Sequence, residues 1–412
     1  QMMGVDAIAA VSVFFPILFF LLAFVIGISA GTTVLVGQAW GAQNLEKVRC
    51  VIGSTLFMTL IGGSVIAVLG VMMAEPMLKL LGTDAKVMHL SLPYVQWMLA
   101  GSPLLFVYII YTSILRGVGD SVTPLIALSL TSLIGLAVTP VLLKGYFGFP
   151  ALGIVAPAIA TILGYAAVLI FLGFYLNYKN HPLKIDARLL QSIRHDATLS
   201  KLILKLGIPT GIQMVTTSLA GLVIIGLVNH YGAHATAAYG AVNQVLNYIQ
   251  FPALSISIAA SIFAAQAIGA GKPDLLAKVT RTALGMNVIF TGSLITLAYL
   301  FSKYLMALFI TDHSVIELGQ QLLFIVLWAV LFFGASAIFA SIMRASGTVN
   351  VPMMINILTI ILIEVPCAYW FSSLWGLTGI WTAYALSFVC LCVLQASYYQ
   401  FVWKKTKIKV LI

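Results

Sequence analysis

The sequence QAWGA at residues 38–42 returns as QAIGA at residues 266–270, which is 228 positions further along the chain. The same offset relates three residues of the first half to three of the second: Arg116, Gly119 and Pro124 return as Arg344, Gly347 and Pro352. The match needs no gap between residues 4 and 148. Two copies of one hydrophobic unit in a single chain are typical of secondary transporters.

The composition indicates that the chain is embedded in lipid. Charged residues make up 8% of its 412 residues and hydrophobic residues 61%, whereas a soluble domain carries about 25% charged residues. Apolar stretches long enough to cross a bilayer recur throughout, without the alternation of barrel strands. We therefore predict an all-α polytopic membrane protein with eleven spans at 7–38, 48–73, 87–115, 122–144, 151–177, 201–229, 235–267, 275–302, 315–343, 350–373 and 377–403. Mid-span prolines such as Pro103 and Pro366 should bend their helices.

The basic residues predict the orientation of the chain in the membrane. Seventeen of the 21 Lys and Arg residues fall in one alternate set of connections, and Lys79, Lys86, Lys144 and Lys303 fall in the other. The positive-inside rule places the first set, and the C-terminus with it, in the cytoplasm. The net charge of +10 therefore reflects topology and contact with anionic membrane lipid, and we expect no nucleic-acid partner.

The repeat also predicts the division into domains. We expect an N-terminal lobe at 1–178, a cytoplasmic linker at 179–200 and a C-terminal lobe at 201–412. The span at 201–229 has no counterpart in the first half, so a helix before Gln1 is expected to be missing, and a cleaved signal peptide is the alternative. The complete plan would be two six-helix bundles. Six is an even number, so the bundles would be related by a pseudo-twofold axis along the membrane normal.

No enzyme chemistry is indicated. The four cysteines lie in or beside apolar helices, where free thiols behave as small hydrophobic groups. His230 and His234 are separated by a loop that contains Gly232, which does not make a metal site. We find neither a nucleophile–base pair nor metal-ligand spacing, and we predict no metal and no cofactor.

Candidate binding residues are polar positions whose repeat counterparts are apolar, because the shared fold does not require them. Asn243, Asn247 and Gln250 share one helix face, and their counterparts are Phe15, Phe19 and Leu22. Asn356 replaces Leu128, and Gln213 lies in the span without a counterpart. These residues could line a substrate or cation cavity, or they could form a hydrogen-bonded seam between helices.

Glu364, whose counterpart is Leu136, is the most informative polar residue. It alone among eleven acidic residues lies well inside a span, where an ionised carboxylate costs about 2.5–3.5 kcal/mol or more. Asn356 lies about 80° around the same helix, so the two could line one cleft. We expect Glu364 to bind H⁺, Na⁺ or a cationic substrate. The alternative is a neutral carboxyl that donates to a backbone carbonyl near Pro366.

The paired motifs at 38–42 and 266–270, the two Arg-x-x-Gly turns and the stretch from Ala237 to Gly271 resemble the MATE family (multidrug and toxic compound extrusion), in its bacterial DinF-like branch. The resemblance covers about residues 4 to 400. It implies export of small organic compounds, often cationic, driven by inward Na⁺ or H⁺ through alternating access. It also implies a multi-pass protein of the bacterial inner membrane, and we expect a monomer.

The chain departs from the family at the cation sites that the resemblance implies. The DinF-like branch carries Asn and Asp four residues apart in its fifth span, where this chain has Gly135 and Thr139. Another branch has a carboxylate where this chain has Thr217. Glu364 could replace these groups, with Thr139 in the same cavity.

A flippase for a lipid-linked or amphipathic lipid substrate is the alternative function, although it should place basic residues in its cavity. A channel or structural protein would not explain the unequal halves.

Overall fold

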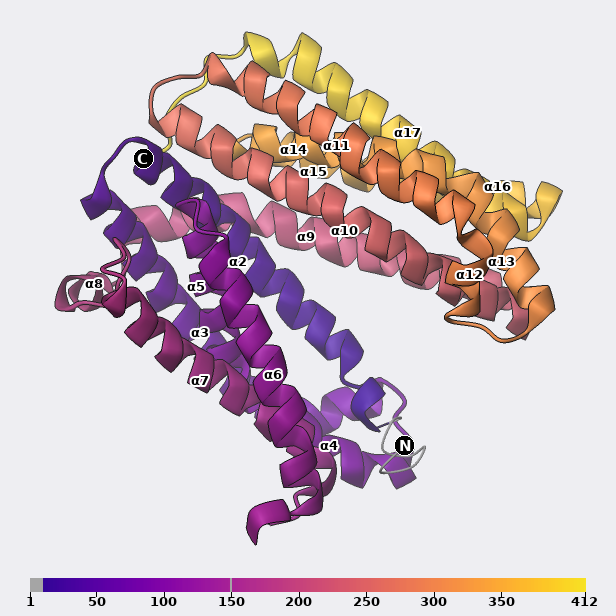
Figure 1. Ribbon diagram of the computed structural model, residues 1–412, viewed down its shortest axis with the longest axis horizontal. Helices are drawn as coiled ribbons and strands as arrows, with labels where there is room; N and C mark the ends of the chain where they lie inside the picture. The colour runs from indigo at the N-terminus through magenta and orange to yellow at the C-terminus, as the bar shows by residue number, and fades with distance from the viewer. Residues whose placement is uncertain (1–9, 149) are drawn as a thin grey trace. The chain divides into compact units, whose positions relative to one another are not determined.

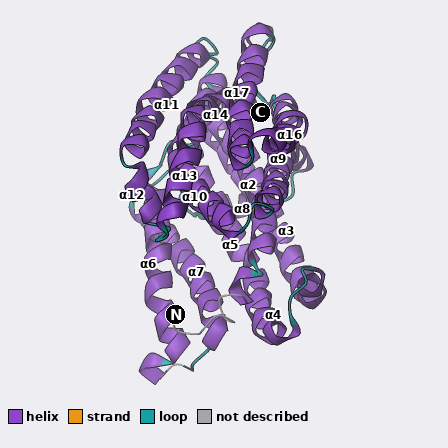
Figure 2. Cartoon of the chain, turned by 90° about the vertical axis from the view of Figure 1, so that its right-hand side faces the viewer, coloured by secondary structure: helices purple, strands orange, loops and turns teal. Residues whose placement is uncertain are grey.

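The computed structural model describes residues 10–148 and 150–412, and helices form all of its regular secondary structure in this part of the chain (Figures 1 and 2). The first residues of the sequence repeat and Asp6 lie outside the described residues. The longer helices are α2 (Phe15–Gly41), α3 (Leu45–Leu80), α4 (Ala85–Ala100), α5 (Ser102–Gly117), α6 (Val122–Lys144), α7 (Ala156–Tyr178), α9 (Ala197–Asn229), α10 (Ala233–Gly269), α11 (Leu275–Leu300), α13 (His313–Val326), α14 (Val330–Ala345), α15 (Asn350–Thr359), α16 (Val365–Trp375) and α17 (Leu377–Phe401). The short elements are α8 (Ala187–Ser192), α12 (Ser302–Ala307), the π-helical turn η4 (Ile360–Glu364) and the 3₁₀ turns η1 (Tyr146–Gly148), η2 (Gly153–Val155), η3 (Leu327–Ala329) and η5 (Trp403–Lys405).

The predicted membrane spans are confirmed. Ten helical segments of the described chain are long and apolar enough to cross a membrane, and the bent pair α4 and α5 makes eleven. The bend of 46° falls at Gly101, two residues before Pro103. Proline lacks an N–H group, so the first turn of a new helix accommodates it without loss of a hydrogen bond. This is the bend that the sequence predicts at Pro103. Other prolines, among them Pro140, Pro209 and Pro252, lie inside helices that continue through them.

The chain divides into two compact units, Gln1–Gly211 and Ile212–Ile412, with the division inside α9. In unit 1, helices α2, α3 and α5 pack on one another, and α6 pairs with α7 beside α5. Small hydroxyl groups join these helices inside the core. Ser29 donates to the Ser113 hydroxyl at 2.6 Å, and the Thr32 and Thr55 hydroxyls lie 3.2 Å apart.

Unit 2 is organised around α10, which packs against α11, α13 and α14, while α17 packs against α13, α14 and α16. Its larger apolar core includes Trp381, which is fully buried, and Leu323. A second apolar cluster around Ile342 and Trp403 lies at the ends of α10, α14 and α17. Two clusters arise because these helices are longer than one core.

The turns of the two units repeat at the offset found in the sequence. Gly119 and Gly347, which end the two Arg-x-x-Gly motifs, both have positive φ, at 98° and 86°. Gln43 and Gly271, also 228 positions apart, have φ of 57° and 67°. Glycine adopts this conformation without steric strain. The same chain reversal therefore follows corresponding helices in both units.

The segment predicted as a linker is attached to unit 1. The Tyr111 hydroxyl donates to the carbonyl of Leu183 at 2.8 Å, and Arg49 lies 3.6 Å from the carboxylate of Asp186. The Ser192 hydroxyl, at the end of α8, reaches the carbonyl of Arg49 at 3.1 Å. These contacts hold the connection between α7 and α9 against the ends of α3 and α5. The predicted domain boundaries themselves stay a prediction.

Candidate functional site

Glu364 is the last residue of a π-helical turn inside a membrane span. Pro366 follows it, and a proline ring clashes with the carbonyl four residues earlier and offers no N–H group in return. The helix adapts by a change of register, because the N–H group of Val365 bonds to the carbonyl of Ile360, five residues back. π turns of this kind occur often at functional sites. The sequence therefore places its intramembrane carboxylate where the backbone is irregular.

Among the described residues, the carboxylate of Glu364 has one hydrogen-bonding partner. It is half-buried, and its Oε2 atom accepts from the hydroxyl of Ser387 on α17 at 3.2 Å. The carbonyl of Tyr384 competes for the same hydroxyl proton at 2.9 Å. A serine has one proton to donate, and an ionised carboxylate can accept about four hydrogen bonds. Most of the acceptor capacity of Glu364 is therefore open to a proton, a metal cation or a cationic group.

No positive side chain neutralises Glu364. In the part of the chain that the structure describes, every salt bridge lies elsewhere, and Glu364 pairs with no Lys, Arg or His. Among the same residues no group of three or more His, Cys, Asp or Glu is arranged to hold a metal. One carboxylate and one hydroxyl are fewer ligands than the four of a structural zinc site.

Aromatic side chains stand beside this carboxylate. Tyr384 on α17 is close enough to interact electrostatically with Glu364, and its hydroxyl lies 3.2 Å from that of Tyr239 on α10. The ring of Trp381 contacts both, with its centroid 5.4 Å from that of Tyr239 and 5.5 Å from that of Tyr384. Phe388 continues the row along α17. Aromatic faces beside a carboxylate attract organic cations.

The three amides predicted on one helix face lie on α10, outside the core of unit 2. Asn243 and Gln250 are half-buried and Asn247 is exposed, while Val245 and Leu246 between them are buried. Among the described residues none of the three amides has a side-chain hydrogen bond. Within the described chain these amides therefore form no seam of hydrogen bonds between helices, and they are available to bind a ligand.

The remaining predicted residues have separate surroundings. Asn356 on α15 has a buried Oδ1 atom without a hydrogen-bond partner in the described chain. Asn356 precedes the π turn that ends at Glu364, and no hydrogen bond joins these two residues in the described chain. Gln213 on α9 accepts a hydrogen bond from Arg344 at 3.4 Å. Thr139 lies half-buried on α6 in unit 1, whereas the other six predicted residues belong to unit 2.

Sequence reasoning missed Ser387, Tyr384 and Tyr239. The signal was present, because continuing the repeat pairs Ser387 with Ile159 and Tyr384 with Ala156. These are the same polar-for-apolar differences that selected Glu364. Serine and tyrosine are unremarkable in a membrane helix, so only their contact with the carboxylate distinguishes them.

Repeated bundles of membrane helices with an unpaired intramembrane carboxylate define a membrane transporter and not an enzyme. The MatE family model matches residues 1–141 and 209–370, and the chain belongs to this family. The resemblance to MATE transporters in the sequence is thereby confirmed.

Relatives and solved structures agree with this assignment. The chain is 44% identical over 412 residues to a protein of Bacillus subtilis named probable multidrug resistance protein YoeA, covering 100% of this chain and 89% of that protein. It is 28% identical to an FAD transporter of Shewanella oneidensis, covering 92% of this chain and 83% of that protein. An outward-facing multidrug resistance MATE transporter has the same fold, with a TM-score of 0.89 at 20% identity over 98% of this chain and 90% of that one.

Proposed function

We propose that this protein is an antiporter that exports amphipathic organic cations in exchange for inward H⁺ or Na⁺, with Glu364 as the coupling site. The observation that carries the proposal is a carboxylate inside a membrane span whose only hydrogen-bonding partner within the described chain is the shared hydroxyl of Ser387. Such a group is costly unless it is loaded with a proton or a cation. The relative named probable multidrug resistance protein supports drug-like substrates.

The mechanism follows from the single negative charge. A H⁺ or Na⁺ ion that binds Glu364 from outside neutralises the carboxylate and favours one arrangement of the two halves. Release of the ion to the cytoplasm restores the charge, which favours the other arrangement and attracts the organic cation. An ion shifts such an equilibrium only by its difference in affinity between the two states. Alternating access would then couple inward movement of the ion to outward movement of the substrate.

The surroundings of Glu364 favour an organic cation over an anion. The ring of Tyr384 offers a cation–π contact of about 0.5–2 kcal/mol beside the charge. The second candidate is a flippase for an amphipathic lipid. One relative is named FAD transporter, so anionic substrates belong in the same assay.

The test uses the purified protein in liposomes with a Na⁺ gradient or a pH gradient imposed separately, and it follows a fluorescent organic cation. Glu364→Gln should abolish gradient-driven uptake while thermal unfolding stays near that of the wild type. Glu317→Gln is the matched control, because Glu317 lies exposed on α13 beside His313. Transport by Glu364→Gln equal to that of the wild type would remove Glu364 from the mechanism. Transport of a fluorescent lipid or of FAD alone would favour the second candidate.

We also propose that the protein lies in the bacterial inner membrane as a monomer with a cytoplasmic C-terminus. The asymmetry of Lys and Arg between the two sets of connections supports this orientation. A reporter fused after Ile412 that is active only in the cytoplasm tests it. Light scattering of the purified protein tests the monomer.

A further inference from the structure

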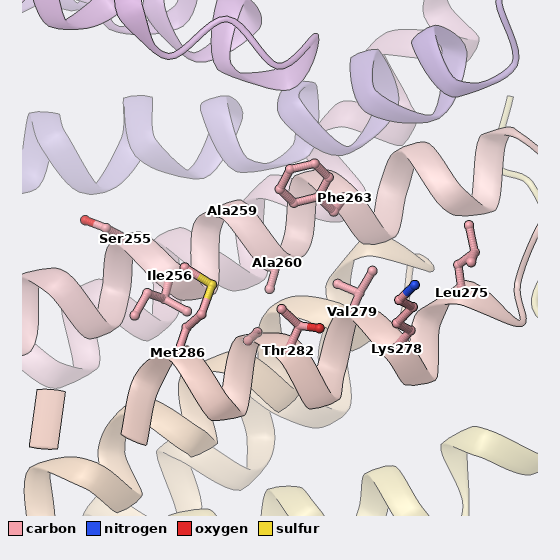
Figure 3. Close-up of a pocket in the computed structure, with 11 residues that line it drawn as sticks. Ser255, Ile256, Ala259, Ala260, Phe263, Leu275, Lys278, Val279, Thr282 and Met286 are labelled. Atoms are coloured by element: carbon pink, nitrogen blue, oxygen red, sulfur yellow. The ribbon is translucent and has the colours of Figure 1, made fainter. Parts of the chain in front are cut away.

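A lateral groove runs between α10 and α11 within unit 2 (Figure 3). It has a volume of about 550 Å³, and its lining is apolar except for Ser255, Thr282 and Lys278. Figure 3 shows Lys278 and Leu275 at one end of the groove and Met286 and Ser255 at the other. From Leu275 to Met286 the helix rises about 16 Å. This is about half of the ~30 Å hydrocarbon core, so the groove spans one leaflet.

Small side chains create the groove, and large ones border it. Ala259, Ala260 and Ala283 leave the space between the helices. Phe263 is 60% exposed and Met286 is 43% exposed, so the walls stay open to the surroundings of the chain. Exposed apolar walls around an unfilled groove predict an apolar ligand in contact with both helices.

The equivalent surface of unit 1 is covered by the chain itself. Gly31 is the counterpart of Ala259, and a Cβ atom on Gly31 would lie 2.6 Å from the carbonyl of Ile203 on α9. Ser54, the counterpart of Thr282, has its hydroxyl 3.2 Å from that of Ser200. The start of α9 thus fills in unit 1 the site that unit 2 leaves open. No described segment of unit 2 takes the place of α9.

The end of the groove carries a basic side chain. Lys278 lines it, and Arg281 follows one turn later on the same helix. Their repeat counterparts are Cys50 and Gly53, whereas Lys47 and Arg49 of unit 1 correspond to Leu275 and Ala277. Both units therefore have basic residues near this end of the helix, but only unit 2 has them at positions 278 and 281. Neither residue forms a salt bridge within the described chain, even though Asp274 lies four residues before Lys278. Lys278 at the end of an apolar groove one leaflet long, with Arg281 one turn further along α11, matches the shape and charge of an anionic lipid.

We propose that this groove binds one acyl chain of an anionic phospholipid, with Lys278 and Arg281 paired to the lipid headgroup. In the proposed orientation the lipid comes from the cytoplasmic leaflet, which is the anionic one. The lipid would occupy in the second half the place that α9 occupies in the first. Binding stabilises unit 2 by mass action, because the groove exists only in the folded state.

The test measures lipid binding to the full chain in detergent by native mass spectrometry and by thermal unfolding. The probes are dioleoyl phosphatidylglycerol and dioleoyl phosphatidylcholine, which share acyl chains and differ in charge. The wild type should prefer phosphatidylglycerol, and added salt should weaken this preference. Lys278→Gln combined with Arg281→Gln should lower the affinity for phosphatidylglycerol roughly 30-fold and remove the preference. Lys303→Gln, at the opposite membrane surface, should retain it.

A second pair of variants tests the groove itself. Ala259→Leu places an isobutyl group in the groove and should displace both lipids, while Ala277→Leu adds the same group to an exposed position of α11 that does not line it. Equal binding of the two lipids to the wild type would overturn the proposed headgroup contact. Lipid binding by Ala259→Leu equal to that of Ala277→Leu would overturn the site. Neither result depends on Glu364, so failure here leaves the proposed transport mechanism untouched.

Discussion

Replacement of Gly207 by alanine should separate two helices that now touch through their backbones. Gly27 and Gly31 on α2 face Gly207 on α9, and a Cβ atom on Gly207 would lie 2.6 Å from the carbonyl oxygen of Gly27. Ordinary contacts begin near 3.4 Å, so the helices would have to move apart by about 0.8 Å. Backbone atoms cannot rotate out of the way as a side chain can. Small residues at such crossings are what allow membrane helices to approach closely.

The expected loss follows from this clash. Overpacking of this kind costs about 1–3 kcal/mol. Alanine also favours a helix over glycine by about 1 kcal/mol, which partly hides the clash. Gly221→Ala on the same helix removes this ambiguity, because a Cβ atom on Gly221 meets no atom within 4 Å. The Gly207 variant should therefore be about 1–3 kcal/mol less stable than the Gly221 variant.

Thermal unfolding of both variants in the same detergent provides the measurement. For a unit of 211 residues this difference lowers Tm by about 2–12 °C. Gly27→Ala should cost about as much, since its Cβ atom would lie 2.7 Å from the carbonyl of Gly207. The double variant should lose less stability than the sum of the two single variants, because both changes force apart the same helix crossing. Equal Tm values for the Gly207 and Gly221 variants would show that α2 and α9 do not cross at these glycines.

Two further predictions concern pH. Burial lowers the pKa of His181; the charge of Asp120 opposes this shift and that of Lys179 adds to it. The unfolded chain therefore binds the proton more readily, and the stability of the folded chain should fall as pH drops through about 6.5. His181→Gln should flatten this part of a plot of Tm against pH. The hydroxyl and the N–H group of Ser314 and the N–H group of Val315 donate hydrogen bonds that lower the pKa of Asp312 at the start of α13. The stability that the ionised carboxylate of Asp312 adds is therefore present above about pH 4 and is lost as pH falls through the pKa of the folded state. Hydrogen exchange should show the first turn of α13 losing protection in acid in the wild type but keeping it in Asp312→Asn.

The membrane spans could be predicted because lipid imposes a simple rule on composition. Stretches of about 20 apolar residues must be helical where no water is available to the backbone. The ends of the helices are less constrained, and α3 continues to Leu80 although the apolar run predicted a span ending at residue 73. Lys79 and Glu75 form a salt bridge of 2.7 Å in this extension. A helix that leaves the membrane continues on local interactions, which hydropathy does not report.

The candidate site was predictable only in part. The charge of Glu364 in an apolar span identified it from the sequence alone. Pro366 indicated a bend, but the choice of a π turn depends on which N–H group can reach which carbonyl. Ser387 could not be singled out, because its importance comes from a hydrogen bond with Glu364 in η4, and the two residues are 23 positions apart in the sequence. Contacts of this length depend on how the helices pack.

The difference between the two halves separates functional from structural polarity only when packing is added to it. Asn287 also replaces a smaller residue, since its counterpart is Thr59. It is buried, donates to the carbonyl of Leu331 at 3.1 Å and accepts from Thr291 at 3.0 Å, and Gly334 leaves room for its amide. The NH₂ group and the oxygen of that amide therefore both have hydrogen-bond partners, and local packing accounts for the presence of Asn287 at this position. Glu364 differs because, among the described residues, its carboxylate has a single shared hydrogen-bond donor and no basic partner. An apolar counterpart selects a position, and an unsatisfied group at that position indicates a ligand.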